Sequence, residues 1–246
     1  MTTQELLQAV PGDEDWQKDC WLRNWIFDVQ QTLLRLFDGD WSAVERECSL
    51  DLYAIRQKRE LLQELRRGRV GPCFPIWSGR LYWPMSPRSE DISIDDIAHA
   101  LAGIGRFNNY HPKNRLPISV AQHGVYVSRK VSPRAELLGL MHDATEAYLH
   151  DIISPIKSLL QPAYGALEAL CWRAVADRYG IPEDDDAWAE VKAADARALL
   201  TEGRDCMPEA GIWLEPPVPV YPDRIVEMSR HDAERTFLER FHELTG

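Results

Sequence analysis

The chain lacks the features that mark secreted, membrane-spanning or thiolate-zinc proteins. Its five cysteines are scattered, odd in number and form no C-x-x-C pair, so neither a disulfide framework nor a cysteine zinc site is indicated. No apolar run approaches the roughly 20 residues that a membrane span needs. The first residues also lack the basic and then apolar layout of a signal peptide. We therefore expect an unprocessed cytoplasmic protein that does not contact a membrane.

The chain also has fewer basic residues, 28, than acidic residues, 39. The formal net charge is −11, and the sequence pI is about 5.1. Stable binding to a nucleic-acid backbone relies on many lysines and arginines that neutralise phosphates, so this balance argues against a nucleic-acid partner. A small anionic substrate can still be met by a local group of cations and a metal ion.

Several common catalytic motifs are missing from the sequence. It contains no G-x-x-x-x-G-K-[ST], no G-x-S-x-G and no H-E-x-x-H, and it has no internal repeat. Strand-like and helix-like patterns do not alternate, which argues against a parallel sheet with covering helices. With 246 residues, of which 45% are hydrophobic, the chain is long enough to bury a core, and we expect an all-α fold.

Apolar residues recur at helical spacing along most of the chain. Breakers and β-formers mix at residues 73–84, which predicts a short extended or hairpin segment, and Gly180 is expected to end a helix. We place a domain boundary near residue 70, with a helical extension at 1–70 and the main domain at 71–246. The expected helices lie at about 14–37, 42–67, 94–104, 120–130, 134–149, 164–179, 187–202 and 225–244.

One segment, residues 141–151, gathers side chains that bind metals or move protons. On a helix, His142 and Glu146 are four residues apart and share a face, and Asp143 lies one step round from His142. A histidine and an aspartate that are adjacent in the sequence can bind the same cation. A carboxylate one helical turn later can then orient water or transfer protons. His150 and Asp151 follow in the same segment.

Residues from three expected helices can complete a metal site. Two histidines and two aspartates suit one divalent ion such as Mn, Co, Fe, Ni or Zn, and they leave coordination positions open for catalysis. The four candidate ligands are His123, His142, Asp143 and Asp195.

This order of His, then His-Asp, then Asp on successive helices resembles the HD-domain phosphohydrolase superfamily. Within it, the chain looks like the 5′-deoxynucleotidase branch, in which Glu follows the His-Asp pair after two residues and Asp comes a turn later. The resemblance spans roughly residues 71–210. It rests on Arg106-Phe107, residues 119–123, Glu146, Asp151, residues 154–157 and residues 191–202.

The resemblance implies a role for each matching residue. Glu146 and Asp151 would orient water and relay protons, and Arg106 and Lys157 would neutralise phosphate oxygens. Phe107, where the bacterial monophosphatases typically show Trp, would stack on a base or sugar. The implied activity is metal-dependent removal of the 5′-phosphate from deoxynucleoside monophosphates, by a protein that we expect to be a homo-oligomer, dimer or higher.

Two other functions stay open. A deoxynucleoside triphosphate triphosphohydrolase would use the same chemistry and more cations, for which the sequence offers Arg80, Arg88, Lys113 and Arg115 besides Arg106. A non-catalytic metal-binding module, with the Trp-rich N-terminus engaging a partner, would need the ligands but no acid-base pair.

Some candidate residues also have a structural interpretation. Arg106 can form an ion pair with Asp95 or Asp96, and Asp151 can simply end its helix. His150 is expected to be a neighbour of the site and not a ligand.

Overall fold

A computed structural model describes residues 67–113, 115–207 and 219–246. The chain divides into two compact units, Met1–Gly68 and Arg69–Gly246. The expected helices at 14–37 and 42–67, and with them nearly all of the N-terminal extension at 1–70, lie outside the described residues. The second unit carries all the candidate site residues.

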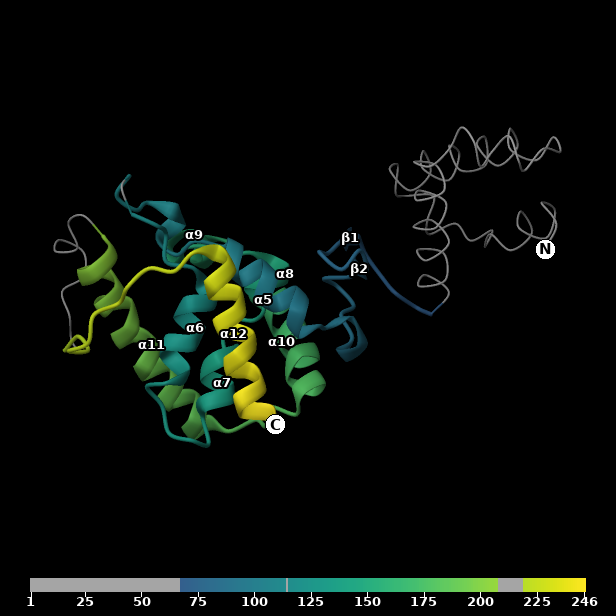
Figure 1. Ribbon diagram of the computed structural model, residues 1–246. Coiled ribbons are helices and arrows are strands. Elements are labelled where there is room, and N and C mark those ends of the chain that lie inside the picture. The colour runs from purple at the N-terminus through teal and green to yellow at the C-terminus, as the bar shows by residue number, and fades with distance from the viewer. Residues whose placement is uncertain (1–66, 114, 208–218) are drawn as a thin grey trace, which may run out of the picture. The chain divides into compact units, whose positions relative to one another are not determined.

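The second unit is built from helices with a small hairpin, which confirms the all-α fold class (Figure 1). Strands β1 (Phe74–Pro75) and β2 (Leu81–Tyr82) pair antiparallel, with Phe74 opposite Tyr82. No helix in the described ranges is long and apolar enough to cross a membrane. The helices are α5 (Ile94–Gly103), α6 (Val120–Ser128), α7 (Glu136–Met141), α8 (Glu146–Leu149), α9 (Ser154–Leu159), α10 (Ala163–Tyr179), α11 (Asp185–Cys206) and α12 (Arg230–Thr245).

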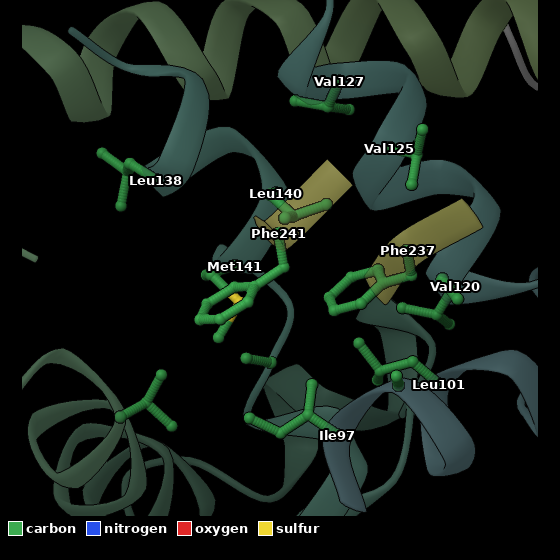
Figure 2. Close-up of a cluster of buried hydrophobic side chains, with 14 of the residues drawn as sticks. Ile97, Leu101, Val120, Val125, Val127, Leu138, Leu140, Met141, Phe237 and Phe241 are labelled. Carbon is green, nitrogen blue, oxygen red and sulfur yellow. The ribbon is translucent and has the colours of Figure 1, made fainter. Parts of the chain in front are cut away.

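Helix α6 lies at the centre of this unit. It contacts α5, α7, α11 and α12, and nearly all of its side chains are buried. In Figure 2 the rings of Phe237 and Phe241 from α12 lie in one cluster with Val120 of α6 and Met141 of α7. Because apolar side chains cover α6 from several sides, a polar residue on this helix is buried wherever it points.

Polar side chains cap the starts of α6 and α11, and a glycine ends α10. Ser119 accepts a hydrogen bond from the Gln122 N–H at the start of α6, and Asp184 accepts one from Ala187 at the start of α11. Gly180 ends α10 in the left-handed conformation, with φ 63°, as predicted. These caps fix the ends of the helices that carry the candidate ligands.

The expected single helix at 134–149 is wrong. Helix α7 ends at Met141 and α8 begins at Glu146, and residues 142–145 between them form tight turns. The Ala144 N–H bonds to the Met141 carbonyl at 2.8 Å and the Glu146 N–H to the Asp143 carbonyl at 3.0 Å, so the hydrogen bonds span three residues in place of four. The four-residue spacing of His142 and Glu146 therefore does not place them on one face of a regular helix.

Two further differences concern helix boundaries. The expected helix at 225–244 begins only at Arg230, where Ser229 accepts a hydrogen bond from the Asp232 N–H. Helix α9, which we did not predict, follows Ile153 and has Pro155 in its first turn. Its side chains are mostly exposed, so it lacks the buried apolar stripe by which a helix is recognised in a sequence.

Helices α6 and α7 approach closely at two glycines. A Cβ atom added at Gly124 would lie 2.8 Å from the backbone oxygen of Leu140, and one added at Gly139 would lie 3.1 Å from the Cα atom of Ser128. Neither neighbour is a flexible side-chain end, so any larger residue must push the helices apart. This approach places the residue next to Gly124, His123, beside the end of α7.

We predict that Gly124→Ala destabilises the protein. The added methyl group meets backbone, and such overpacking costs about 1–3 kcal/mol, which exceeds the roughly 0.5–1 kcal/mol that alanine gains over glycine within a helix. Urea denaturation measures the free energy of unfolding. Gly165→Ala in α10 is the control, because its Cβ would meet only the side-chain end of Gln161; a Gly124→Ala protein as stable as this control would contradict the prediction.

Candidate metal centre

Three predicted ligands meet at the junction of α6 and α7. One ligand atom each from His123, His142 and Asp143 lies within 4.8 Å of the other two. The Asp143 Oδ2 atom is 3.2 Å from Nε2 of His142 and 3.7 Å from Nε2 of His123. The His123 side chain is fully buried and that of His142 nearly so.

Hydrogen bonds on the far side of each ring orient the two imidazoles. Nδ1 of His142 lies 2.9 Å from the carbonyl oxygen of Gly139, and Nδ1 of His123 lies 2.6 Å from Oε1 of Glu202. Because a carbonyl accepts and an ionised carboxylate accepts, each Nδ1 carries the proton and donates it. Both Nε2 atoms are buried and make no hydrogen bond of good geometry. In the neutral form that these contacts favour, with the proton on Nδ1, each ring would present an Nε2 lone pair to the group, as metal-binding histidines do.

The spacing of the ligand atoms fits a divalent ion. Two atoms that each bind an ion at about 2.1 Å lie about 3.0 Å apart at a right angle and about 3.4 Å apart at the tetrahedral angle. The distances of 3.2 Å and 3.7 Å to Asp143 Oδ2 are close to these values. Imidazole and carboxylate donors suit the transition ions expected from the sequence, Mn, Fe, Co, Ni or Zn.

Asp195 reaches the group from α11. Its Oδ1 atom is 3.0 Å from Nε2 of His123, and its side chain is 40% exposed. Asp195 thus lies next to His123 but outside the group of three ligand atoms, and its role as the fourth ligand stays a prediction. Its exposure marks the side on which the group opens to solvent.

Arg106 lies against the same group. Its Nε donates to Oε2 of Glu202 at 2.7 Å, and its two terminal nitrogens are 3.7 Å from Asp143 and 4.0 Å from Asp195. Burial lowers the pKa of Arg106, but the surrounding carboxylates, Glu202 foremost, outweigh it and raise that pKa further. The suggested ion pair with Asp95 or Asp96 is replaced by the pair with Glu202, since Asp96 binds Arg80 at 3.1 Å.

The backbone around Arg106 is fixed by neighbouring strand-like pairing. Its N–H bonds to the Ile118 carbonyl at 2.9 Å, and Gly105 forms an antiparallel bridge with Ser119. A Cβ atom at Gly105 would clash with the side chain of Asn109. The backbone pairing and the hydrogen bond to Glu202 together fix the position of the Arg106 guanidinium.

The charges of this group shift several pKa values in opposite directions. Burial raises the pKa of Asp143, but His142, His123 and Arg106 outweigh it and hold that pKa below its ordinary value. Burial and the Arg106 charge lower the pKa of His123, but Glu202 and Asp195 raise it to about 10. These values describe the protein without a cation, and a bound divalent ion would favour loss of the proton from His123 Nε2.

The pKa values of the two predicted catalytic carboxyls, Glu146 and Asp151, shift in the opposite direction from that of the ligand Asp143. Burial, with help from Asp143 and Asp151, raises the pKa of Glu146 to about 9, and one of its oxygens is buried without a hydrogen bond. Burial also raises the pKa of Asp151, against the opposing charge of Arg106. The pKa values of Asp143 and Asp195 are lowered instead, and neighbouring carboxyls whose pKa values shift in opposite directions are typical of acid-base sites.

Phe107 and Lys157 have structural partners of their own. The Phe107 ring packs against the cluster of Ile118, Cys206 and Ile225, and its backbone has a φ of 53°. The Lys157 ammonium forms an ion pair with Glu168 and lies over the Tyr164 ring. Their predicted contacts with substrate stay predictions.

His150 does not join the ligand atoms. It is exposed, its Nδ1 atom lies 3.2 Å from the Asp151 carbonyl oxygen, and its own carbonyl accepts a hydrogen bond from the Tyr164 hydroxyl. The expectation that it is a neighbour of the site agrees with this placement.

Glu202 is the residue that the sequence analysis did not single out as part of the site. It is fully buried and bonds to both His123 and Arg106. Its position seven residues after Asp195, two turns on the same helix face, is the signal that could have found it.

The fold and this group of side chains define a helical protein with a candidate centre for one divalent ion. No protein-family model matches the chain. The chain is 34% identical over 172 residues to the uncharacterized protein YfdR of Escherichia coli, across 69% of this chain and 93% of the relative. It is 35% identical over 134 residues to an uncharacterized protein of Rhodobacter capsulatus, across 51% of this chain and 68% of that relative. The chain belongs to the same family as YfdR.

We predict that Asp143→Ala abolishes metal binding. With Mn²⁺ at about 100 times its dissociation constant, the wild-type protein should gain about 2.7 kcal/mol of stability, whereas the variant lacks the carboxylate that lies against both histidines and should gain none. Thermal unfolding with and without Mn²⁺ measures the difference. The exposed Asp177→Ala variant on α10 serves as the control, and an Asp143→Ala protein that Mn²⁺ stabilises as well as this control would refute the ligand assignment.

Proposed function

We propose that the chain is a metal-dependent phosphohydrolase of the HD-domain superfamily that acts on deoxynucleotides. Its most fitting reaction is hydrolysis of the 5′-phosphate of deoxynucleoside monophosphates. The observation that carries this proposal is the position of Arg106, a largely buried cation whose terminal nitrogens lie 3.7 Å from Asp143 and 4.0 Å from Asp195. A phosphate on the candidate ion would lie within reach of this guanidinium.

Each part of the group has a task in such a reaction. A divalent ion held by the ligand set would supply Lewis acidity, which lowers the pKa of water and polarises a phosphate oxygen. The planar guanidinium of Arg106 binds phosphate oxygens through its terminal nitrogens while Glu202 holds its Nε.

Glu146 and Asp151 handle the protons. In the reaction, the oxygen of water bonds to phosphorus, the bond from phosphorus to the 5′ oxygen breaks, and that oxygen gains a proton. Glu146, whose pKa is raised to about 9, can hold a proton near neutral pH and pass it on. Burial also raises the pKa of Asp151, which supports the two residues as the relay.

The ion pairs of the other candidate arginines favour a monophosphate over a triphosphate. Arg80 pairs with Asp96 at 3.1 Å, Arg88 lies 3.6 Å from Glu90, and Arg115 pairs with Glu227. These partners neutralise three of the cations that a triphosphate would require. The triphosphohydrolase stays the second candidate, since the same group can attack an α-phosphorus.

A non-catalytic metal-binding module is the third candidate. A structural site needs ligands only, and a buried carboxyl with a raised pKa such as Glu146 costs stability that such a site has no reason to bear. The expected cytoplasmic location and homo-oligomeric state belong to this proposal and stay predictions.

Hydrolysis of a nucleotide panel tests the proposal. The metal-stripped protein, supplied again with Mn²⁺ or Co²⁺, should release nucleoside and orthophosphate from deoxynucleoside monophosphates, as chromatography of the products can show. Nucleoside with tripolyphosphate from triphosphates would favour the second candidate. No hydrolysis with any divalent ion would contradict both enzyme functions.

We predict that Glu146→Gln loses activity but keeps the metal. Removing a proton-transfer group lowers kcat by about 10²–10⁴-fold, while the ligands His123, His142 and Asp143 are unchanged. Steady-state kinetics and a metal titration on the same sample separate the two effects. The exposed Glu239→Gln variant on α12 is the matched control, and a fully active Glu146→Gln enzyme would rule out the proton-relay role.

A further inference from the structure

Glu202 of α11 is a fully buried carboxylate that contacts two candidate functional residues at once. Its Oε1 lies 2.6 Å from Nδ1 of His123, and its Oε2 accepts from Nε of Arg106 at 2.7 Å. Its exposed fraction is 0%. Burying a carboxylate is costly unless charged partners compensate it, and here the two partners are a candidate metal ligand and a candidate phosphate-binding group.

The contact with His123 decides which nitrogen can bind a metal. An ionised carboxylate can only accept hydrogen bonds, so the proton of the neutral imidazole stays on Nδ1. The lone pair of Nε2 then points at Asp143 and Asp195, 3.7 Å and 3.0 Å away. The opposite tautomer would turn an N–H toward the ion and could not bind it.

The contact between Glu202 and Arg106 fixes the orientation of the Arg106 guanidinium. Glu202 binds Nε of Arg106, so the two terminal nitrogens are left free of Glu202. These nitrogens lie toward Asp143 and Asp195. Each oxygen of Glu202 thus faces one donor, Nδ1 of His123 on Oε1 and Nε of Arg106 on Oε2, which is the arrangement that suits an ionised carboxylate.

We propose that Glu202 is a positioning residue that sets the metal-binding tautomer of His123 and the phosphate-binding orientation of Arg106 together. The part of this inference that concerns Arg106 rests on the proposed function. The part that concerns His123 does not, because it predicts metal affinity in the absence of any nucleotide.

The variant Glu202→Gln tests the link to the metal. The amide has one acceptor oxygen and one donor nitrogen, so it cannot accept from both His123 and Arg106 as the carboxylate does. Loss of a residue that hydrogen-bonds to a metal ligand typically weakens metal binding by about 10–100-fold. We expect a rise of this size in the dissociation constant for Mn²⁺, measured by electron paramagnetic resonance on the full chain.

Asp205→Asn is the matched control on the same helix. Asp205 is also buried and ion-paired, but its partners are Arg204 and Arg224. It should lower the melting temperature and leave the dissociation constant for Mn²⁺ unchanged. A Glu202→Gln protein that melts at a lower temperature yet binds Mn²⁺ like wild type would reduce Glu202 to a structural role and overturn the proposal.

A measurement on the wild-type chain covers the case in which Glu202→Gln does not fold. In ¹⁵N NMR spectra of the Zn²⁺-loaded protein, His123 should keep its Nδ1 proton while Nε2 shows the shift of a metal-bound nitrogen. Zinc bound through Nδ1 of His123 would overturn the proposal.

Kinetics separate this inference from the proposed function. If the wild-type protein hydrolyses deoxynucleoside monophosphates, Glu202→Gln at saturating Mn²⁺ should raise KM by about 10-fold or more, because Arg106 is no longer held against the phosphate. An unchanged KM would contradict the link to Arg106. If no nucleotide is hydrolysed, the proposed function fails, and the Mn²⁺ and NMR results still decide the role of Glu202 toward His123.

Discussion

The close approach of α6 and α7 is the constraint on which the candidate site depends. Gly124 lies so near the backbone of Leu140 that no side chain fits between them. This contact is what brings His123, in the middle of one helix, next to His142, just past the end of the other. Their ring centroids are 5.2 Å apart. The apolar packing around α6 thus has a direct chemical consequence, since it sets the distance between two ligands.

The site concentrates opposite charges in a space that water reaches from one side. Glu202 is sealed inside, whereas Asp195 is partly exposed. The buried carboxylate of Glu202 is compensated by Arg106 and His123, and the negative charge of Asp143 and Asp195 favours a cation. A net charge of −11 is therefore compatible with the proposed anionic substrate, because the Arg106 guanidinium is a local positive charge whose position is fixed by Glu202.

The sequence predicts a large part of this arrangement, and its failures have physical causes. Helix α10 and its end at Gly180 follow from apolar spacing and a left-handed glycine. The break after Met141 was missed, because three-residue and four-residue hydrogen bonds use nearly the same backbone angles and no glycine or proline marks the change. Glu202 was missed as a site residue because an acidic side chain on a helix normally faces solvent. The packing of α11 against α6 is what buries it.

The central claim is that His123, His142 and Asp143 bind one ion through Nε2, Nε2 and a carboxylate oxygen. An anomalous difference map from a crystal grown with Mn²⁺ tests it most directly. The account predicts a single strong peak within about 2.0–2.3 Å of these three atoms, as for first-row transition ions with such ligands. A peak bound through the Nδ1 atoms, a peak at another place in the chain, or no peak at all would contradict it.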